Sequence, residues 1–276
     1  MDLTKLIDGV EQAASISIKA QQGDYLGEDG LLYCHKCNTP KQCRVTILGV
    51  ERTPMCLCKC EIEKREQEEA ERKRIEFQKR VKEMRIKAFP EAEMQKWDFA
   101  HDDGESGQIV TIAKRYVENF DKMLKDGKGL LMFGTVGNGK TFAAACIVNS
   151  LIDKGFPCAM RKFSEIAQDI FDGKLNPHDL NRYALLVLDD LMAERKTEYM
   201  QEIVFNVIDS RNRAKLPTIV TSNLTAEAIK NPDDIAYQRI FSRLLEMCVP
   251  IEVKGEDRRR KILKDSFSEY SELLGI

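Results

Sequence analysis

The chain has 276 residues, of which 43% are apolar and 32% charged, and its formal net charge is −2. This charge is too close to zero for a protein that coats nucleic acid by bulk electrostatics, so any DNA contact needs a local basic patch. No apolar run approaches the roughly 20 residues of a membrane span. The N-terminus also lacks the uninterrupted apolar stretch of a signal peptide, so we expect a cytoplasmic protein without a membrane partner.

Two helices are predicted in the first third of the chain. Apolar residues at near-helical spacing from Leu3 to Ile18 predict the first. The second covers residues 61–89, where almost every residue is a good helix former and acidic and basic residues such as Glu69 and Lys73 lie four apart. Both signs of charge are interspersed along this segment, which favours a solvated spacer helix over a nucleic-acid arm.

A cysteine-rich stretch lies between these helices and contains six of the nine cysteines. Such clustering in a cytosolic protein favours a metal site over disulfides. Zinc takes four ligands in a tetrahedron, and the C-x-x-C turn at Cys34 and Cys37 supplies two. On an extended segment Cys56, Cys58 and Cys60 share one face, so any adjacent two of them could complete the site. The stretch has few large apolar side chains, so a metal would also supply the stability that a core cannot.

The remaining two thirds of the chain alternate between apolar strands and amphipathic helices, beginning near residues 88–95. Strands are expected at "KGLLMFG", "PCAMRKF", "YALLVLDDL" and "PTIVTSN", and helices at "KTFAAACIVNSLIDKG" and "EYMQEIVFNVIDSRNRAK". Apolar strands that alternate with helices indicate an α/β fold, in which a parallel sheet is covered by helices on both faces.

The stretch "GTVGNGKT" fits the phosphate-binding pattern G-x-x-x-x-G-K-[ST], and it lies between a predicted strand and a predicted helix. The glycines let the loop wrap tightly around an anion, Lys140 reaches the outer phosphates, and the Thr141 hydroxyl can hold magnesium. We therefore expect ATP to be bound by Gly134, Thr135, Val136, Gly137, Asn138, Gly139, Lys140 and Thr141.

Polar side chains follow two of the predicted strands. Asp189 and Asp190 end "LLVLDDL" at the carboxyl edge of the sheet, where ligands of such folds bind. We expect Asp189 to hold magnesium and Asp190 to orient or deprotonate the attacking water. Asn223 ends the next strand and can hold that water near the terminal phosphate. The alternative is that the paired aspartates cap the following helix.

Two sets of arginines have two interpretations. Arg239 and Arg243 lie four apart on one helical face, and Arg258 to Arg260 precede a final predicted helix. By themselves they fit solvated surface charge. With an ATP site, a cation is needed at the developing phosphate charge, and an arginine supplied by a neighbouring subunit would make hydrolysis depend on assembly.

Five motifs in a fixed order over roughly residues 95–265 resemble the AAA+ ATPases of the DnaC/DnaI helicase-loader type, including phage versions, with IstB as a relative. They are "GKGLLMFGTVGNGKT", "LLVLDDL", "PTIVTSNL", "RIFSRLLE" and "KGEDRRR". The resemblance implies an AAA+ ATPase domain at 93–276. Ahead of it we expect a charged linker helix at 63–92 and a helicase-interacting region at 1–62, with a zinc module at about 30–62.

The resemblance also implies roles for single residues. Asn223 matches the sensor-1 position and Arg243 the arginine finger. Arg259 matches the sensor-2 arginine best, but Arg258 stands where a tyrosine is usual, so the register within this arginine run stays open. Asp190 replaces the glutamate common in AAA+ proteins, and this shorter side chain implies slow basal hydrolysis.

The cysteine pattern also resembles that of the phage loaders. Phage loaders carry C-x-x-C followed by C-[KR]-C-E, which places the second pair of zinc ligands on Cys58 and Cys60, with Cys56 as the alternate. The zinc ligands expected on this basis are Cys34, Cys37, Cys58 and Cys60.

The function implied by the resemblance is the ATP-dependent loading of a hexameric DnaB-type replicative helicase onto single-stranded DNA, with hydrolysis as the release switch. The implied cofactors are ATP, Mg2+ and Zn2+. The implied partners are the helicase, single-stranded DNA and further copies of the chain, through AAA+ interfaces. Two alternatives remain, an IstB-like transposition helper and a zinc-containing adaptor that binds ATP without significant turnover.

Overall fold

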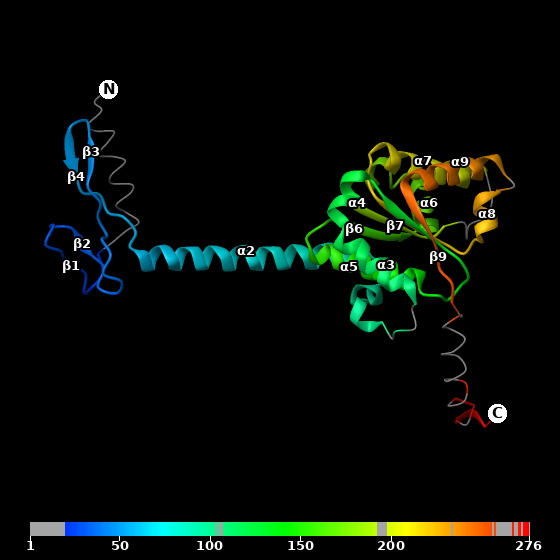
Figure 1. The fold of residues 1–276 in the computed structure, drawn as a ribbon, viewed down its shortest axis with the longest axis horizontal. Coiled ribbons are helices and arrows are strands. Elements are labelled where there is room, and N and C mark those ends of the chain that lie inside the picture. The colour runs from blue at the N-terminus through cyan, green and yellow to red at the C-terminus, as the bar shows by residue number, and fades with distance from the viewer. Residues whose placement is uncertain are drawn as a thin grey trace. The chain divides into compact units, whose positions relative to one another are not determined.

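The structure is a computed structural model that describes residues 20–102, 104, 107–191, 198–232, 234–255, 257, 267, 270–271 and 273–275. The chain forms two compact units, Met1–Phe77 and Gln78–Ile276 (Figure 1). The predicted helix from Leu3 to Ile18 and the arginines 258–260 lie outside the described residues. None of the helices that the structure describes is both long and apolar enough to cross a membrane.

Two short antiparallel hairpins make up the first part of the first unit. β1 (Tyr25–Leu26) pairs with β2 (Leu32–Tyr33), and β3 (Val45–Ile47) pairs with β4 (Val50–Arg52). The rings of Tyr25 and Tyr33 stack with their centroids 5.8 Å apart across the first hairpin. Such short hairpins are marginal in water by themselves, so other contacts have to hold this unit together.

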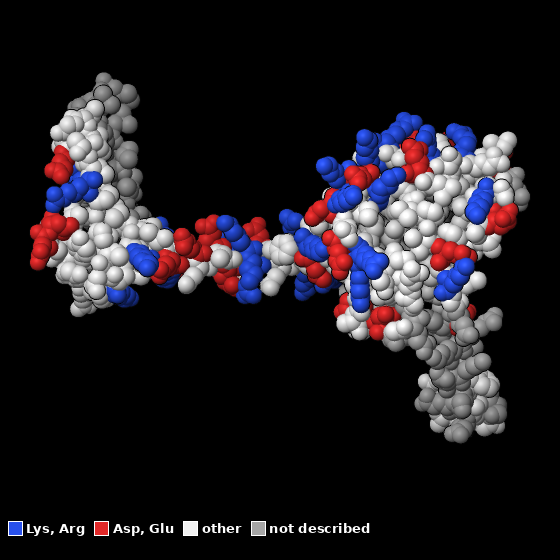
Figure 2. Space-filling view, in the orientation of Figure 1, with Lys and Arg blue, Asp and Glu red and all other residues white. Residues whose placement is uncertain are grey.

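The predicted charged helix is confirmed as α2 (Lys59–Ala88), in which only Ala88 is buried. Acidic and basic side chains alternate along it (Figure 2) and form ion pairs such as Lys73–Glu69, with 2.6 Å between the charged atoms. An exposed pair of this kind contributes about 0.3–0.5 kcal/mol. The end of the helix is held more firmly, because Ala88 belongs to a buried apolar cluster against which Val81 and Met84 pack.

The second unit contains a parallel sheet of five strands in the order β6-β7-β8-β5-β9. The four predicted strands are confirmed as β5 (Gly129–Phe133), β6 (Cys158–Lys162), β7 (Leu185–Leu191) and β8 (Thr218–Ser222). A fifth strand, β9 (Cys248–Glu252), was not predicted and pairs with β5 at the edge of the sheet. It contains Pro250, a residue that sheets accept at their edges.

Helices cover both faces of this sheet, as predicted for an α/β fold. Along β5, Leu130 and Met132 join one buried apolar cluster, and Leu131 and Phe133 join another. The first cluster includes residues of α3 and α5, and the second includes residues of α6, α7 and α9. The helices of this unit are α3 (Gln108–Glu118), α4 (Phe120–Asp126), α5 (Lys140–Asp153), α6 (Phe163–Phe171), α7 (Glu198–Arg213), α8 (Ala226–Lys230) and α9 (Ile235–Met247), with 3-10 turns η1 (Ala92–Lys96), η2 (Phe99–His101) and η3 (Pro177–Arg182).

A buried arginine anchors the start of β8. Arg211 of α7 has no exposed surface, and its guanidinium donates hydrogen bonds to the carbonyl oxygens of Leu180, Tyr183 and Pro217. Its Nε lies 3.3 Å from the hydroxyl oxygen of Thr218, the first residue of the strand. Because these contacts satisfy the buried cation, they fix β8 at the end opposite to the predicted ATP site.

Candidate functional site

The predicted phosphate-binding loop joins β5 to the N-terminus of α5. Gly134 and Gly137 have φ angles of 134° and 81°, which residues with a side chain rarely adopt. A Cβ at Gly134 would also collide with the carbonyl oxygen of Val253, and one at Gly137 with the carboxylate of Asp257. The glycines therefore give the loop its shape, and the backbone amides at the start of α5 suit an anion.

The lysine of this loop is held by hydrogen bonds to other atoms of the loop. Lys140 is 6% exposed, and its Nζ donates hydrogen bonds to the carbonyl oxygens of Gly134 (2.9 Å) and Thr135 (2.6 Å) and to Oδ1 of Asn138 (3.0 Å). Asn138 in turn donates from Nδ2 to the carbonyl oxygen of Val253, just after β9. The ammonium group is thus fixed among loop atoms, where a phosphate would meet it.

The two predicted magnesium ligands lie together. Thr141 at the start of α5 donates from its hydroxyl to Oδ1 of Asp189, at 3.1 Å. Asp189 is only 5% exposed, and this burial raises the pKa of its carboxyl above the ordinary value, against the opposing effect of its hydrogen bonds with Thr221 and Thr141. A hydroxyl beside a carboxylate offers the oxygen ligands that Mg2+ prefers, so the pair fits the ion.

A bulge in β7 separates the two aspartates. Strict alternation would put Asp190 on the apolar face occupied by Leu186 and Leu188. Instead the register with β8 shifts between Leu188 and Leu191, so that Leu191 joins this apolar cluster and Asp190 is exposed, with a φ of 58°. Aspartate tolerates this left-handed conformation better than most residues.

The predicted base and the predicted water-holding amide are in contact. Asn223, which follows β8, donates from Nδ2 to Oδ1 of Asp190 at 2.8 Å. The backbone N–H of Asp190 donates to the hydroxyl of Thr221 at 2.9 Å. A carboxylate held beside a neutral amide at the edge of the sheet can accept a proton from a water molecule that the amide orients.

The predicted arginine finger does not join this group. Arg243 of α9 lies with its Nε 3.4 Å from Asp209 of α7 and its Nη1 2.9 Å from Glu246. The other arginine of this helix, Arg239, lies over the ring of Phe205 with its guanidinium carbon 4.5 Å from the ring centroid. Arg259 lies outside the described residues.

Sequence reasoning missed Thr221, a residue of β8 that is 2% exposed. Its hydroxyl donates to Asp189 at 2.6 Å and accepts from the N–H of Asp190 at 2.9 Å. The only signal in the sequence was a hydroxyl residue two positions before Asn223.

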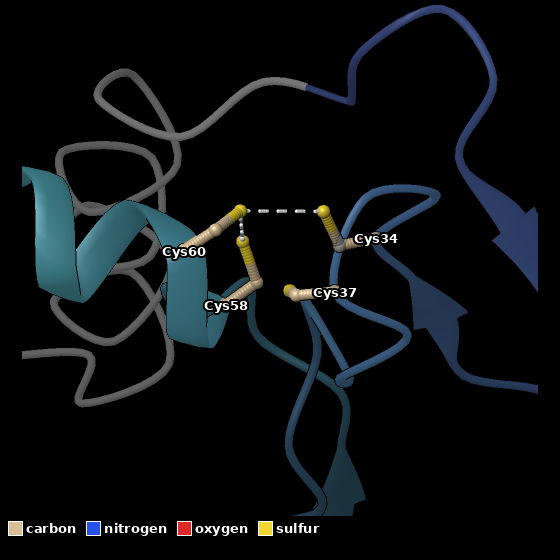
Figure 3. A group of neighbouring side chains, drawn as sticks. All are labelled: Cys34, Cys37, Cys58 and Cys60. Carbon is tan, nitrogen blue, oxygen red and sulfur yellow. Dashed lines mark hydrogen bonds between the residues drawn. The ribbon is translucent and has the colours of Figure 1, made fainter.

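The first unit brings four predicted zinc ligands together (Figure 3). The sulfur atoms of Cys34, Cys37, Cys58 and Cys60 all lie within 4.8 Å of one another. The sulfurs of Cys34 and Cys60 are 3.6 Å apart, and those of Cys58 and Cys60 are 3.3 Å apart. Zn–S bonds near 2.3 Å in a tetrahedron imply a sulfur–sulfur spacing of about 3.8 Å. The cluster is therefore compatible with zinc.

One expectation about these cysteines was wrong. Cys56, Cys58 and Cys60 do not share one face of an extended segment, because α2 begins at Lys59 and Cys60 belongs to its first turn. Cys58 precedes the helix, and its carbonyl oxygen accepts from the N–H groups of Glu61 and Ile62. The sulfur of Cys56 lies apart from the cluster, 3.7 Å from the carbonyl oxygen of Pro40.

Local hydrogen bonds position both halves of the cluster. In the C-x-x-C turn, the N–H of Asn38 donates to the carbonyl oxygen of Cys34 at 2.9 Å. At the helix start, Oε2 of Glu61 accepts from the N–H of Cys58 at 3.4 Å, as the glutamate of a capping box does. The N–H of Lys59 donates to the hydroxyl of Thr39, which joins the two halves.

A buried lysine lies next to the cluster. Lys41 has no exposed surface, and its Nζ lies 3.0 Å from Oδ2 of Asp24 and 3.4 Å from Oε1 of Glu61. The other carboxylate oxygen of Glu61 is 3.3 Å from the sulfur of Cys58. The ammonium group therefore compensates two acids, one of which contacts a predicted zinc ligand.

The thiols of the cluster differ in acidity. A hydrogen bond with Thr39 lowers the pKa of Cys37 to about 5, whereas burial raises the pKa of Cys58 above its ordinary range. Zinc binds thiolates, so metal binding would release the proton that Cys58 otherwise keeps.

The second unit and part of α2 are similar to known proteins. Residues 62–266 match the family model of IstB-like ATP binding proteins. The replicative helicase loader DnaI of Bacillus subtilis (strain 168) is 31% identical over 151 residues, which are 48% of this chain and 48% of the relative. The replicative helicase loader DnaC of Escherichia coli (strain K12) is 28% identical over 148 residues, 50% of this chain and 58% of the relative. The chain thus matches about half the length of these curated relatives.

Solved structures show the same fold. A crystal structure of DnaI aligns with a TM-score of 0.51 at 24% identity and covers 62% of this chain and 96% of that one. The crystal structure of the DnaC helicase loader aligns with a TM-score of 0.50 at 22% identity and covers 59% of this chain and 100% of that one. The predicted resemblance and the predicted fold, a parallel sheet flanked by helices, are confirmed.

Proposed function

The chain belongs to the family of IstB-like ATP-binding proteins, and from this membership we propose that it is an ATP-dependent loader of a hexameric DnaB-type replicative helicase onto single-stranded DNA. Two relatives that match about half of the chain are named replicative helicase loaders, which supports this choice within the family. The cysteine module ahead of the ATPase unit also favours a loader, because it resembles that of phage loaders.

The proposed chemistry is ATP hydrolysis, and the observation that carries it is the chain of contacts from Thr141 through Asp189 and Thr221 to Asp190 and Asn223. The loop amides and Lys140 bind the phosphates. Asp190 accepts a proton from the attacking water, and Asn223 orients both the carboxylate and the water. Magnesium, when bound by Thr141 and Asp189, neutralises charge on the phosphates.

Hydrolysis serves as the release switch in this proposal. The described contacts of Arg243 are with Asp209 and Glu246 and not with Asp189 or Asp190, so as the arginine finger it would serve the site of a neighbouring subunit. Arg259 would act as sensor 2. Turnover would be slow in the isolated chain, because Asp190 is shorter than a glutamate and the finger arrives only on assembly. Zinc held by the four-cysteine cluster would keep the helicase-interacting region folded.

The test mixes the purified chain with the replicative helicase of the same cell, with ATP or with ADP, and measures the masses of the complexes by mass photometry. We expect a complex with ATP that the Lys140→Ala variant does not form, since it loses the phosphate contact. Lys73→Ala is the matched control, because it removes an exposed lysine of α2. Absence of an ATP-dependent complex would refute helicase loading.

A second candidate, an IstB-like transposition helper, is favoured by the description of the family model itself. It predicts no helicase complex in these mass measurements, but an ATP-dependent complex when duplex DNA takes the place of the helicase. The third candidate, an adaptor without turnover, predicts that Asp190→Asn leaves the rate of phosphate release unchanged. The loader proposal predicts that this variant loses phosphate release.

A further inference from the structure

We propose that Thr221 is a positioning residue for hydrolysis, in which one buried hydroxyl sets the orientation of both Asp189 and Asp190; this inference rests on the proposed ATPase function. The hydroxyl oxygen lies 2.6 Å from Oδ1 of Asp189 and 2.9 Å from the backbone nitrogen of Asp190. Among the described residues, Thr221 contacts both acids through its side chain.

The direction of the two hydrogen bonds follows from the groups involved. A backbone N–H can only donate, so the threonine oxygen accepts from Asp190. The hydroxyl has one proton, and an ionised carboxylate can only accept, so that proton goes to Asp189. Because Thr221 is 2% exposed, water does not compete for these bonds. The hydroxyl is therefore held in one orientation by the two acids and holds them in turn.

The bulge in β7 explains why such a residue is needed. At the bulge the regular pairing of β7 with β8 is interrupted between Leu188 and Leu191, and Asp190 has a φ of 58°. The Thr221 hydroxyl takes the N–H of Asp190 that regular pairing would have used. With its backbone fixed in this way, Asp190 reaches Asn223, at 2.8 Å.

The other bond serves the predicted magnesium pair. Asp189 Oδ1 accepts from Thr141 as well as from Thr221, so the two hydroxyls approach one carboxylate oxygen from α5 and from β8. The second carboxylate oxygen is left to other ligands. Loss of the Thr221 hydroxyl would free the carboxylate to rotate and would misplace the base at the same time.

A merely structural role for the hydroxyl can be separated by a matched residue. Thr218 lies on the same strand, is also buried, and its hydroxyl oxygen contacts Nε of Arg211 and the carbonyl oxygen of Leu216. It lies three residues from Thr221, on the other face of β8 and away from both aspartates. Substitution at this position removes a buried hydroxyl of the same strand without touching the site.

The experiment compares Thr221→Val, Thr221→Ser and Thr218→Val with the unsubstituted full-length chain. Phosphate release gives kcat, KM for ATP and the Mg2+ concentration for half-maximal rate, and calorimetry gives ATP binding with and without Mg2+. We expect Thr221→Val to lower kcat by about 10- to 100-fold and to raise the Mg2+ requirement several-fold. KM for ATP and Mg2+-free binding should stay within about twofold, because the loop contacts are intact. Thr221→Ser should restore kcat and the Mg2+ requirement.

Thr218→Val should lower the melting temperature but leave kcat and the Mg2+ requirement unchanged. An unchanged kcat and Mg2+ requirement in Thr221→Val would overturn the inference, and so would a serine variant as impaired as the valine variant, since the methyl group would then be what matters. A chain without any turnover would refute the ATPase proposal instead. The inference would then be decided by calorimetry, where Thr221→Val has to weaken Mg2+-dependent ATP binding and leave Mg2+-free binding intact.

Discussion

Residues 20–77 are stabilised internally by other kinds of contact than the second unit is. Among its described residues the first unit buries three apolar side chains, those of Leu31, Cys34 and Cys58, whereas the second buries apolar clusters on both faces of its sheet. The first unit instead has the four-cysteine cluster and the buried Lys41 between two acids. Where apolar side chains are scarce, clustered cysteines and paired charges take the place of a core.

Two buried charged residues, Lys41 in the first unit and Asp189 in the second, differ in the groups that surround them. Lys41 pairs with Asp24 and Glu61, so its burial is compensated and supports the fold. Asp189 in the second unit accepts hydrogen bonds from the hydroxyls of Thr141 and Thr221 among the described residues, and its burial raises its pKa, so its negative charge opposes folding. The buried charge of Lys41 thus meets charges of opposite sign, whereas the buried charge of Asp189 meets neutral hydroxyl groups.

Removal of a zinc ligand should give the largest effect and should break the first unit alone. Cys58→Ser should abolish the zinc content and make residues 20–77 sensitive to protease, because the binding of structural zinc contributes on the order of 10 kcal/mol to the folding of small zinc modules. The unfolding of the second unit, followed by the fluorescence of its single tryptophan Trp97, should not change.

Cys56→Ser is the matched control for this experiment, since its sulfur lies outside the cluster. Metal analysis should find full zinc in this variant. Full zinc in Cys58→Ser, or loss of zinc in Cys56→Ser, would show that the ligand set is different.

Loss of the buried cation should have the next largest effect. Lys41→Met leaves Asp24 and Glu61 without this counter-ion, and removal of one partner from a buried pair costs about 3–5 kcal/mol. We expect zinc release to a competing chelator to become faster and the first unit to melt at a lower temperature. Lys59→Met makes the same change at a lysine whose side chain is 70% exposed, and it should have little effect. Equal behaviour of the two variants would mean that the buried charges do not hold this unit.

The smallest effect has the opposite sign. Since burial raises the folded-state pKa of Asp189, its ionisation costs stability above the unfolded-state pKa, and that cost disappears as the pH falls below it. Asp189→Asn keeps the oxygen that accepts both hydroxyl protons. In Mg2+-free buffer at pH 7 it should therefore raise the free energy of unfolding of the second unit by about 1 kcal/mol.

Denaturant unfolding followed by Trp97 fluorescence measures this change, and the gain should shrink as the pH is lowered toward 4. Asp190→Asn is the control, because that carboxylate is exposed and its removal should leave stability nearly unchanged. A destabilised Asp189→Asn variant would mean that the charge of Asp189 supports the fold.

Sequence patterns predicted most of this architecture because buried parallel strands are continuous apolar runs and the phosphate loop has a fixed spacing of glycines. β9 is as long as β5, β6 and β8, but it escaped prediction because it contains Pro250 and three of its five residues are exposed, so neither alternation nor a buried apolar run marks it. The helical position of Cys60 escaped because alternate spacing suggested a strand, although Glu61 carried a capping signal. Thr221 and the bulge could not be predicted, because both depend on the pairing of β7 with β8.

Pro250 has a consequence for how copies of the chain can associate. It lies in β9, whose only sheet neighbour among the described strands is β5 and whose residues Val249 and Pro250 are exposed. A proline has no N–H to offer to a further strand, so this edge resists being extended by a second sheet. If copies of the chain associate as proposed, this edge would therefore contribute side-chain contacts and not backbone pairing.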